Sequence, residues 1–123
     1  MNTNAPGPWT GRLLGGRYEV REVIGRGGMA DVYLGVDARL GRQVALKILK
    51  STLSSDPTFR NRFRLEAMSA SKMSHPSIVR VFDAGDEDNG PAGETPPGST
   101  TPYIVMEHVE GHLLSTLMRQ GKL

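Results

Sequence analysis

The 123-residue sequence contains no cysteine, which excludes disulfide bonds and thiolate metal sites. Histidine is scarce as well, because His75, His108 and His112 are the only three and none has the spacing of a metal site. No long apolar run has the character of a signal peptide or a membrane-spanning helix. The formal charge of +2 is too small to indicate nucleic acid or a membrane surface as a partner. The composition therefore predicts a cytoplasmic globular chain without a metal site, and a membrane anchor beyond residue 123 stays an open alternative.

The first half of the sequence predicts three antiparallel strands in succession. β-Branched, aromatic and alternating apolar residues mark the segments 18–24, 30–36 and 42–49, and short links connect them. The first link is rich in glycine, which permits positive φ and lets backbone N–H groups approach a phosphate closely. Lys47 on the third predicted strand can meet the same anion as a point charge. The three strands together predict a phosphate-binding site.

A helix is predicted after the third strand. Asp56 is a suitable N-cap and Pro57 suits the first helical position. Glu66 falls within an apolar stripe of this helix, on the side that must pack against the sheet. A carboxylate buried there needs a cation, because an unpaired buried charge is strongly destabilising. We therefore predict an ion pair between Glu66 and Lys47; the alternative is a rotated helix with Glu66 in solvent.

The second half of the sequence predicts two further strands, at 78–82 and 103–106. Residues 86–102 between them are first acidic and then rich in Gly, Pro and Thr, which is typical of a mobile hairpin loop. A short helix begins near residue 113. The predicted fold class is α+β, with a five-stranded antiparallel sheet and one major helix packed against it.

Two common phosphate-binding motifs are incompatible with the glycine-rich link. The dinucleotide-binding fingerprint requires its glycines to open a helix, but residues 31–36 have the pattern of a strand. The Walker loop requires Gly-Lys-Ser/Thr, and Gly27-Gly28-Met29 lacks it. The remaining interpretation is a β-hairpin whose glycines fold over phosphates.

The ordered motifs resemble the amino-terminal lobe of a bacterial, eukaryotic-like serine/threonine protein kinase, closest to the receptor-type kinases of actinobacteria. The resemblance covers about residues 17–123 and rests on four segments in the family's order. They are Ile24-Gly25-Arg26-Gly27-Gly28-Met29-Ala30-Asp31-Val32, Val44-Ala45-Leu46-Lys47 with Glu66, His75-Pro76-Ser77-Ile78-Val79, and Tyr103-Ile104-Val105-Met106-Glu107. It implies a flexible tail at 1–16, a kinase N-lobe with its hinge at 17–110, and the first helix of a truncated C-lobe at 111–123.

The resemblance also implies a set of ATP contacts. The backbone of Gly25 to Ala30 covers the phosphates, and Lys47, oriented by Glu66, binds the α- and β-phosphates. By the same resemblance, the adenine base of ATP is expected to lie among backbone atoms of the hinge and small or apolar side chains. The full set of expected nucleotide-site residues is Ile24, Gly25, Arg26, Gly27, Gly28, Met29, Ala30, Asp31, Val32, Ala45, Lys47, Met106 as gatekeeper, Glu107 and Val109, with Lys47 and Glu66 as the catalytic pair.

Two departures from the family pattern qualify this expectation. Ala30 stands where the family often has a third glycine, although alanine is still small. No residue matches the His-Arg-Asp loop or the Asp-Phe-Gly motif, which supply the base and the Mg²⁺ ligands. The complete enzyme is expected to use ATP and Mg²⁺ on protein substrates, whereas this chain alone is expected to be inactive.

Three alternatives stay open at the level of sequence. The chain is either the ATP-binding part of a kinase, a non-catalytic module that forms a homodimer or docks through this lobe, or a truncated reading frame.

A basic run near the helix start, Arg60, Arg62 and Arg64, is expected to be solvated. A contact with a phosphorylated segment or a second kinase molecule is the alternative interpretation of that run.

Overall fold

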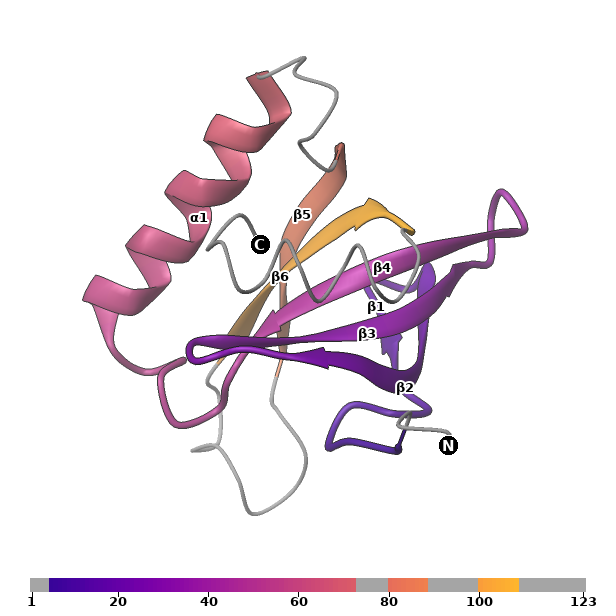
Figure 1. Cartoon of the computed structure of the whole chain (residues 1–123), viewed down its shortest axis with the longest axis horizontal. Helices are drawn as coiled ribbons and strands as arrows, with labels where there is room; N and C mark the ends of the chain where they lie inside the picture. The colour runs from indigo at the N-terminus through magenta and orange to yellow at the C-terminus, as the bar shows by residue number, and fades with distance from the viewer. Residues whose placement is uncertain (1–4, 73–79, 89–99, 109–123) are drawn as a thin grey trace.

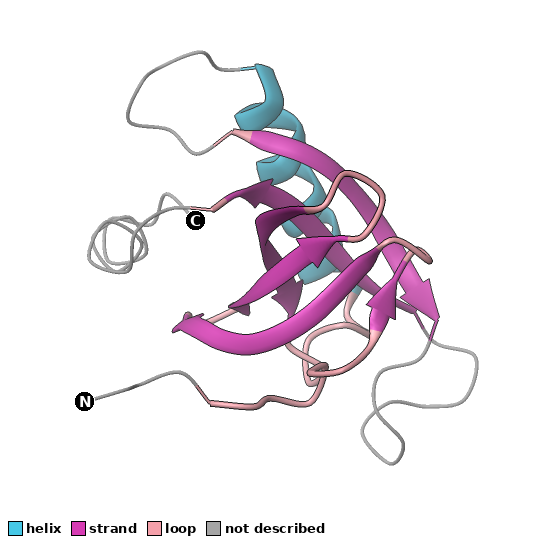
Figure 2. Ribbon diagram, turned by 90° about the vertical axis from the view of Figure 1, so that its right-hand side faces the viewer, coloured by secondary structure: helices cyan, strands magenta, loops and turns pink. Residues whose placement is uncertain are grey.

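The computed structural model describes residues 5–72, 80–88 and 100–108, with the side chains of the helix described as far as Leu65. Within these ranges one antiparallel sheet has the strand order β1-β2-β3-β4-β6-β5, and helix α1 lies across one side of it (Figures 1 and 2). The elements are β1 (Leu13–Leu14), β2 (Tyr18–Arg26), β3 (Ala30–Asp37), β4 (Arg42–Leu49), α1 (Pro57–Lys72), β5 (Val81–Asp88) and β6 (Thr100–Glu107). The predicted α+β class is confirmed.

The predicted number of five strands is too low, because the structure has six among its described residues. The additional strand, β1, pairs Leu13 with Glu19 and Leu14 with Tyr18. The predicted loop at 86–102 is also too long, since β5 continues to Asp88 and β6 already begins at Thr100. Aspartate is depleted in strands. Ion pairs with arginine offset this low strand propensity at Asp86. The predicted strand residues Ile78 and Val79 lie outside the described residues.

Helix α1 begins where the sequence predicts. The backbone N–H of Thr58 donates to Oδ1 of Asp56 at 2.9 Å, and the N–H of Arg60 donates to the Asp56 carbonyl at 3.1 Å. Asp56 is therefore the N-cap, and its carboxylate satisfies one of the donors that a helix start leaves unpaired.

The two faces of the sheet carry separate apolar clusters. We call the first the closed face; its buried residues are Trp9, Leu14, Tyr18, Val20, Val23, Tyr33, Val44, Leu46, Ile48, Tyr103 and Val105. We call the second the lysine face; its buried residues are Ala30, Val32, Ala45, Leu49, Ile104 and Met106, with Phe63 of α1 packed on them and Lys47 among them. Successive side chains of a strand point to opposite faces, so Leu46 and Lys47 belong to different clusters.

The structure differs from the predicted flexible tail over residues 5–16. This segment runs along β2, where the N–H of Gly11 donates to the Val20 carbonyl at 2.8 Å and the N–H of Val23 donates to the Ala5 carbonyl at 2.8 Å. It also places Trp9, which is 3% exposed, in the cluster of the closed face. The Pro- and Gly-rich composition concealed this role because the packing depends on one tryptophan rather than on a periodic pattern.

The sheet curls until its two ends meet around the closed face (Figure 2). The hydroxyl of Tyr18 on β2 donates to Oδ2 of Asp83 on β5 at 2.7 Å, and the N–H of Gly15 donates to Oε1 of Glu87 at 2.7 Å. Burial, and then the hydrogen bond to Asp83, raise the pKa of Tyr18 to about 12.

In the part of the chain that the structure describes, no helix has the length and apolarity to cross a membrane.

Candidate functional site

The strand register aligns the glycine-rich hairpin with Lys47. Gly25 of β2 pairs with Val32 of β3, Val32 pairs with Lys47 of β4, and Lys47 pairs with Ile104 of β6. Directly opposed residues of antiparallel strands share a face, with Cβ atoms about 5 Å apart. The sequence-predicted residues Gly25, Val32 and Lys47 therefore form one row across the lysine face.

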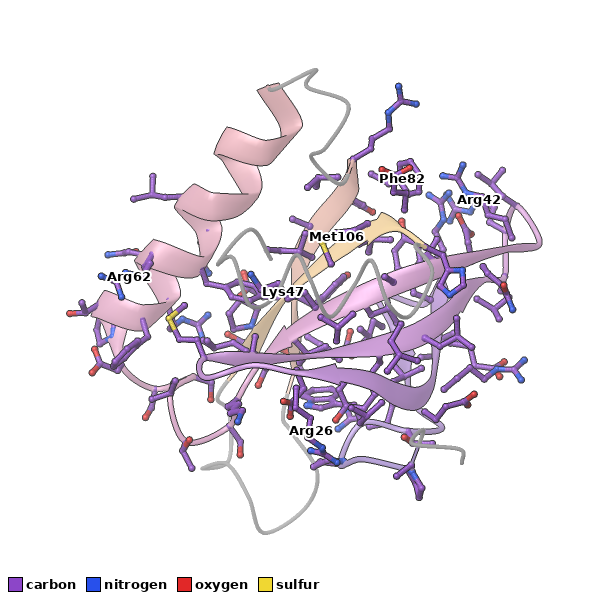
Figure 3. All side chains as sticks on the ribbon, in the orientation of Figure 1. Arg26, Arg42, Lys47, Arg62, Phe82 and Met106 are labelled. Carbon is purple, nitrogen blue, oxygen red and sulfur yellow. The ribbon has the colours of Figure 1, made fainter. Side chains whose placement is uncertain are left out.

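A second row, two residues earlier in β4, is apolar. Leu34 pairs with Ala45, Ala45 with Met106, and Met106 with Val81. Ala45 and Met106 are 1% and 3% exposed, and the small side chain of Ala45 lies between two larger ones. The predicted base-pocket residues Ala45 and Met106 thus lie together beside the row that contains the cation, and Figure 3 labels Met106 and Lys47.

Lys47 is a buried cation, with only 6% of its surface exposed. Its Nζ lies 5.6 Å from the centre of the Phe63 ring of α1, within the range of a cation–π interaction. Burying an ammonium group is unfavourable unless other groups compensate for the lost water. The sequence did not identify Phe63 as a neighbour of this lysine, although its place in the apolar stripe of the helix indicated burial.

The hairpin between β2 and β3 is closed by a hydrogen bond from the Gly27 N–H to the Ala30 carbonyl at 3.0 Å. Ile24 and Met29 are partly buried against the lysine-face cluster. A Cβ built on Gly28 has no neighbour within 4 Å, and its φ lies outside the left-handed region. Nothing in the described polypeptide therefore requires glycine at this position.

Two of the predicted site residues point elsewhere. Arg26 is exposed, and its Nη1 lies 3.8 Å from Oδ2 of Asp31. Asp31 faces away from Lys47, because it alternates with Val32, and its Oδ1 lies 3.8 Å from Nζ of Lys50. Any contact of Asp31 with a ligand on the lysine face must therefore use its backbone.

The predicted hinge is described as far as His108. The N–H of Glu107 donates to the Arg80 carbonyl at 2.9 Å, and the carboxylate of Glu107 accepts a bond from the Arg80 N–H at 3.0 Å. The Glu107 side chain thus holds the start of β5. Val109 lies outside the described residues, as does the side chain of Glu66, so the predicted Lys47–Glu66 pair stays a prediction.

The basic run on α1 is not uniformly solvated, and the expectation is wrong for Arg60. Arg60 and Arg64 both form ion pairs with Asp86 of β5, at 2.9 and 2.8 Å. Arg62 and Arg64 are exposed as predicted, although Arg64 pairs with Asp86, and Arg62 points away from the sheet (Figure 3). The sequence signal for the pairing is the four-residue spacing of Arg60 and Arg64, which places both on one side of the helix.

Comparison with known proteins identifies the family to which this fold belongs. The sequence pattern of the protein kinase domain matches residues 18–123. The chain belongs to the protein kinase family. The fold agrees, since the crystal structure of the Mycobacterium tuberculosis PknI kinase domain superposes on 82% of the chain with a TM-score of 0.59 and 31% identity.

The curated relatives that the chain matches include bacterial serine/threonine kinases. The chain is 50% identical over 113 residues to the probable serine/threonine-protein kinase SCO3848 of Streptomyces coelicolor, and 47% identical over 105 residues to the serine/threonine-protein kinase PknB of Mycobacterium tuberculosis. These alignments cover 90% and 85% of the chain but only 16% of each relative. The chain likewise covers 36% of the PknI kinase domain. The predicted resemblance to actinobacterial kinases is confirmed.

Proposed function

We propose that this chain is the ATP-binding lobe of a serine/threonine protein kinase, with the lysine face as the nucleotide site. The observation that carries the proposal is the cross-strand row Gly25–Val32–Lys47, which aligns the glycine hairpin with a buried ammonium group. In a complete kinase the reaction transfers the γ-phosphoryl group of ATP to a protein hydroxyl.

The residues present fit a nucleotide. The open space at Gly28 lets a phosphate approach the hairpin backbone, whose N–H groups bind anions. Lys47 supplies a positive charge to the α- and β-phosphates, and its burial strengthens that interaction relative to water. Val32, Ala45 and Met106 supply an apolar surface for the base.

The Mg²⁺ that the kinase family uses is not assigned to any described residue. Among the side chains that the structure describes, no three from His, Asp or Glu gather as a metal site. When bound, the metal neutralises charge on the β- and γ-phosphates. What the described residues contribute is positioning, by the hairpin backbone and by Lys47.

The test is an NMR titration of the 123-residue chain with ATP, followed through the methyl signals of Val32 and Ala45. Lys47→Met should weaken ATP binding at least tenfold, because it removes the cation that faces the phosphates. Lys50→Met is the matched control. It removes the same charge from the lysine that directly follows β4, and this lysine pairs with Asp31. Equal ATP affinity of the wild type and Lys47→Met contradicts the proposal.

A second function, association of two copies through this lobe, is supported by one observation. Leu13 and Leu40 are 49% and 58% exposed, and the register places both near the Asp37 end of the sheet. An interface with a second copy at this end of the sheet would bury both leucines. Light scattering should show a dimer, and Leu40→Ser should weaken it. Leu65→Ser is the control, because it changes an equally exposed leucine on α1, and it should leave the dimer intact. A monomer at every concentration argues against this function.

A further inference from the structure

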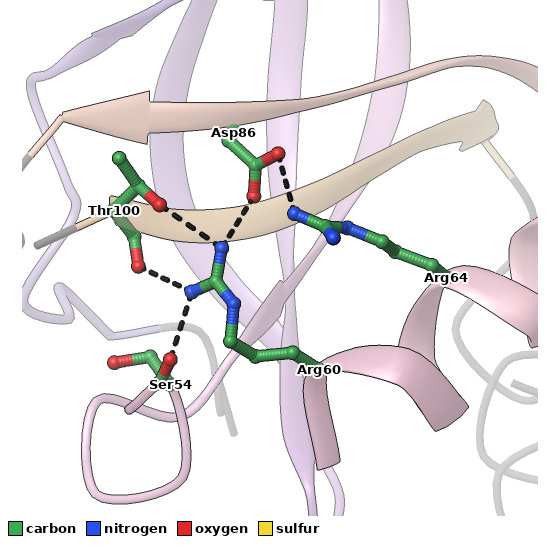
Figure 4. Close-up of polar contacts among 5 residues, drawn as sticks. All are labelled: Ser54, Arg60, Arg64, Asp86 and Thr100. Carbon is green, nitrogen blue, oxygen red and sulfur yellow. Dashed lines mark hydrogen bonds and ion pairs between the residues drawn. The ribbon is translucent and has the colours of Figure 1, made fainter. Parts of the chain in front are cut away.

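Five residues form a polar cluster between the start of α1 and the β5–β6 hairpin (Figure 4). Arg60 donates from Nη1 to the carbonyls of Ser54 and Thr100, at 2.8 and 2.6 Å. It donates from Nη2 to Oδ1 of Asp86 and to the Thr100 hydroxyl, both at 2.9 Å. Arg64 donates to the other oxygen of Asp86 at 2.8 Å. One carboxylate thus binds two guanidinium groups that lie one helical turn apart.

In the first half of α1, where the side chains are described as far as Leu65, little apolar packing fixes the helix to the sheet. Among its described side chains, Phe63 is the one buried in the lysine-face cluster, whereas Leu65 is 61% exposed. An open pocket of about 270 Å³ lies beside Phe63, between α1 and the strands β5 and β6. Close packing would normally fix a helix to a sheet. Here the ionic contacts to Asp86 bridge the two elements next to the pocket.

One of the described side chains, Phe63, connects the cluster to Lys47. Phe63 lies between Arg60 and Arg64 in the sequence, and its ring lies 5.6 Å from Nζ of Lys47. A shift of the first two turns of α1 would therefore move the group that covers the lysine. It would also shift the helix backbone at Glu66, one residue after Leu65.

We propose that Asp86 is a positioning residue for nucleotide binding: by holding Arg60 and Arg64, it sets where Phe63 meets Lys47. This inference rests on the proposed function of Lys47. Asp86 itself lies at the edge of the hairpin and acts on the nucleotide only through the helix. Its role therefore predicts coupling to Lys47, which a purely structural ion pair would not show.

The experiment is a double-mutant cycle on the 123-residue chain, with ATP affinity measured by NMR titration. Asp86→Asn keeps the shape of the side chain but removes its charge, and should weaken ATP binding about threefold to tenfold. In the Lys47→Met background the same change should have no further effect. Arg62→Gln is the matched control, because it removes a guanidinium from the outer face of the same helix. Its ATP affinity should equal that of the wild type.

The outcomes separate the two proposals. If Lys47→Met leaves ATP affinity unchanged, the proposed function fails and the inference fails with it. If Lys47→Met weakens binding but Asp86→Asn does not, the nucleotide site stands and the positioning role is wrong. An equal effect of Asp86→Asn with and without Lys47 also rejects the role, because the cluster then acts independently of the lysine. Should Asp86→Asn unfold the chain, Arg64→Gln supplies the same test at a half-exposed residue, and Arg64→Lys should restore part of the affinity.

Discussion

The closed face and the lysine face of the same sheet are filled in different ways. The closed face is covered by the chain itself, since the curled sheet and residues 5–16 surround large side chains such as Trp9, Tyr33 and Leu46. The lysine face has small side chains at Ala30 and Ala45, and a buried cation among them. One face thus contains large apolar groups that stabilise the sheet. The other contains a cation whose burial is costly, and it is the face to which we assign the nucleotide in our proposal.

This comparison predicts the largest loss of stability on the closed face. Trp9→Ala should lower the free energy of unfolding by about 3–5 kcal/mol, because it removes a fully buried aromatic side chain and leaves a cavity. Urea denaturation followed by circular dichroism measures the change. Leu40→Ala, at an exposed leucine, should change stability by less than about 0.5 kcal/mol. A loss of less than about 1 kcal/mol for Trp9→Ala would show that residues 5–16 cover the sheet without stabilising it.

A smaller loss is expected from adding a methyl group to the closed face. A Cβ on Gly35 would lie 2.5 Å from Cδ1 of Leu46 and 3.1 Å from the backbone carbonyl of Glu19. The leucine must move and the strand must shift, so Gly35→Ala should cost about 1–3 kcal/mol of unfolding free energy. Thermal denaturation measures this, and the double variant with Leu46→Val should recover part of the loss. Unchanged stability in Gly35→Ala would mean that the closed face is packed more loosely than described.

A third prediction concerns the Asp37 edge of the closed face in acid. Hydrogen bonds from Arg17, at 2.9 and 2.8 Å, lower the pKa of Asp37 from 3.8 to about 2. A carboxylate with a lowered pKa stabilises the fold above its unfolded-state pKa, and this contribution is lost as the pH falls from about 4 to about 2. Urea midpoints measured across that range should fall in the wild type. In Asp37→Asn the decline should be less steep; identical slopes would contradict the assignment.

Much of the lysine face could be predicted from local sequence patterns. The two-residue period of strands places Ala45 and Lys47 on one face, and the glycines between two strand patterns indicate the hairpin. The cap at Asp56 is a local signal as well, and the structure confirms it. These features depend on residues near each other in the chain, which is why sequence reasoning reaches them.

The features that escaped prediction depend on contacts between distant residues. Trp9 lies in a Pro- and Gly-rich segment, and only the curled sheet provides the apolar surface that buries it. Arg60 meets Asp86 because β5 returns beside α1, and no local pattern connects the two positions. Their opposite charges were visible in the sequence, but the pairing required the register of the β5–β6 hairpin.

The smallest change in stability is expected at Gly28, and it tests the comparison most directly. A Cβ there meets no atom within 4 Å, so Gly28→Ala should change the unfolding free energy by less than about 0.5 kcal/mol. If the hairpin backbone binds phosphate, however, the added methyl group should weaken ATP binding in the NMR titration. Gly35→Ala should show the reverse, with lower stability and ATP affinity close to wild type while the chain remains folded. Should Gly28→Ala alter neither property, the open space at this glycine is unrelated to nucleotide binding, and the phosphate site must be sought nearer to Lys47.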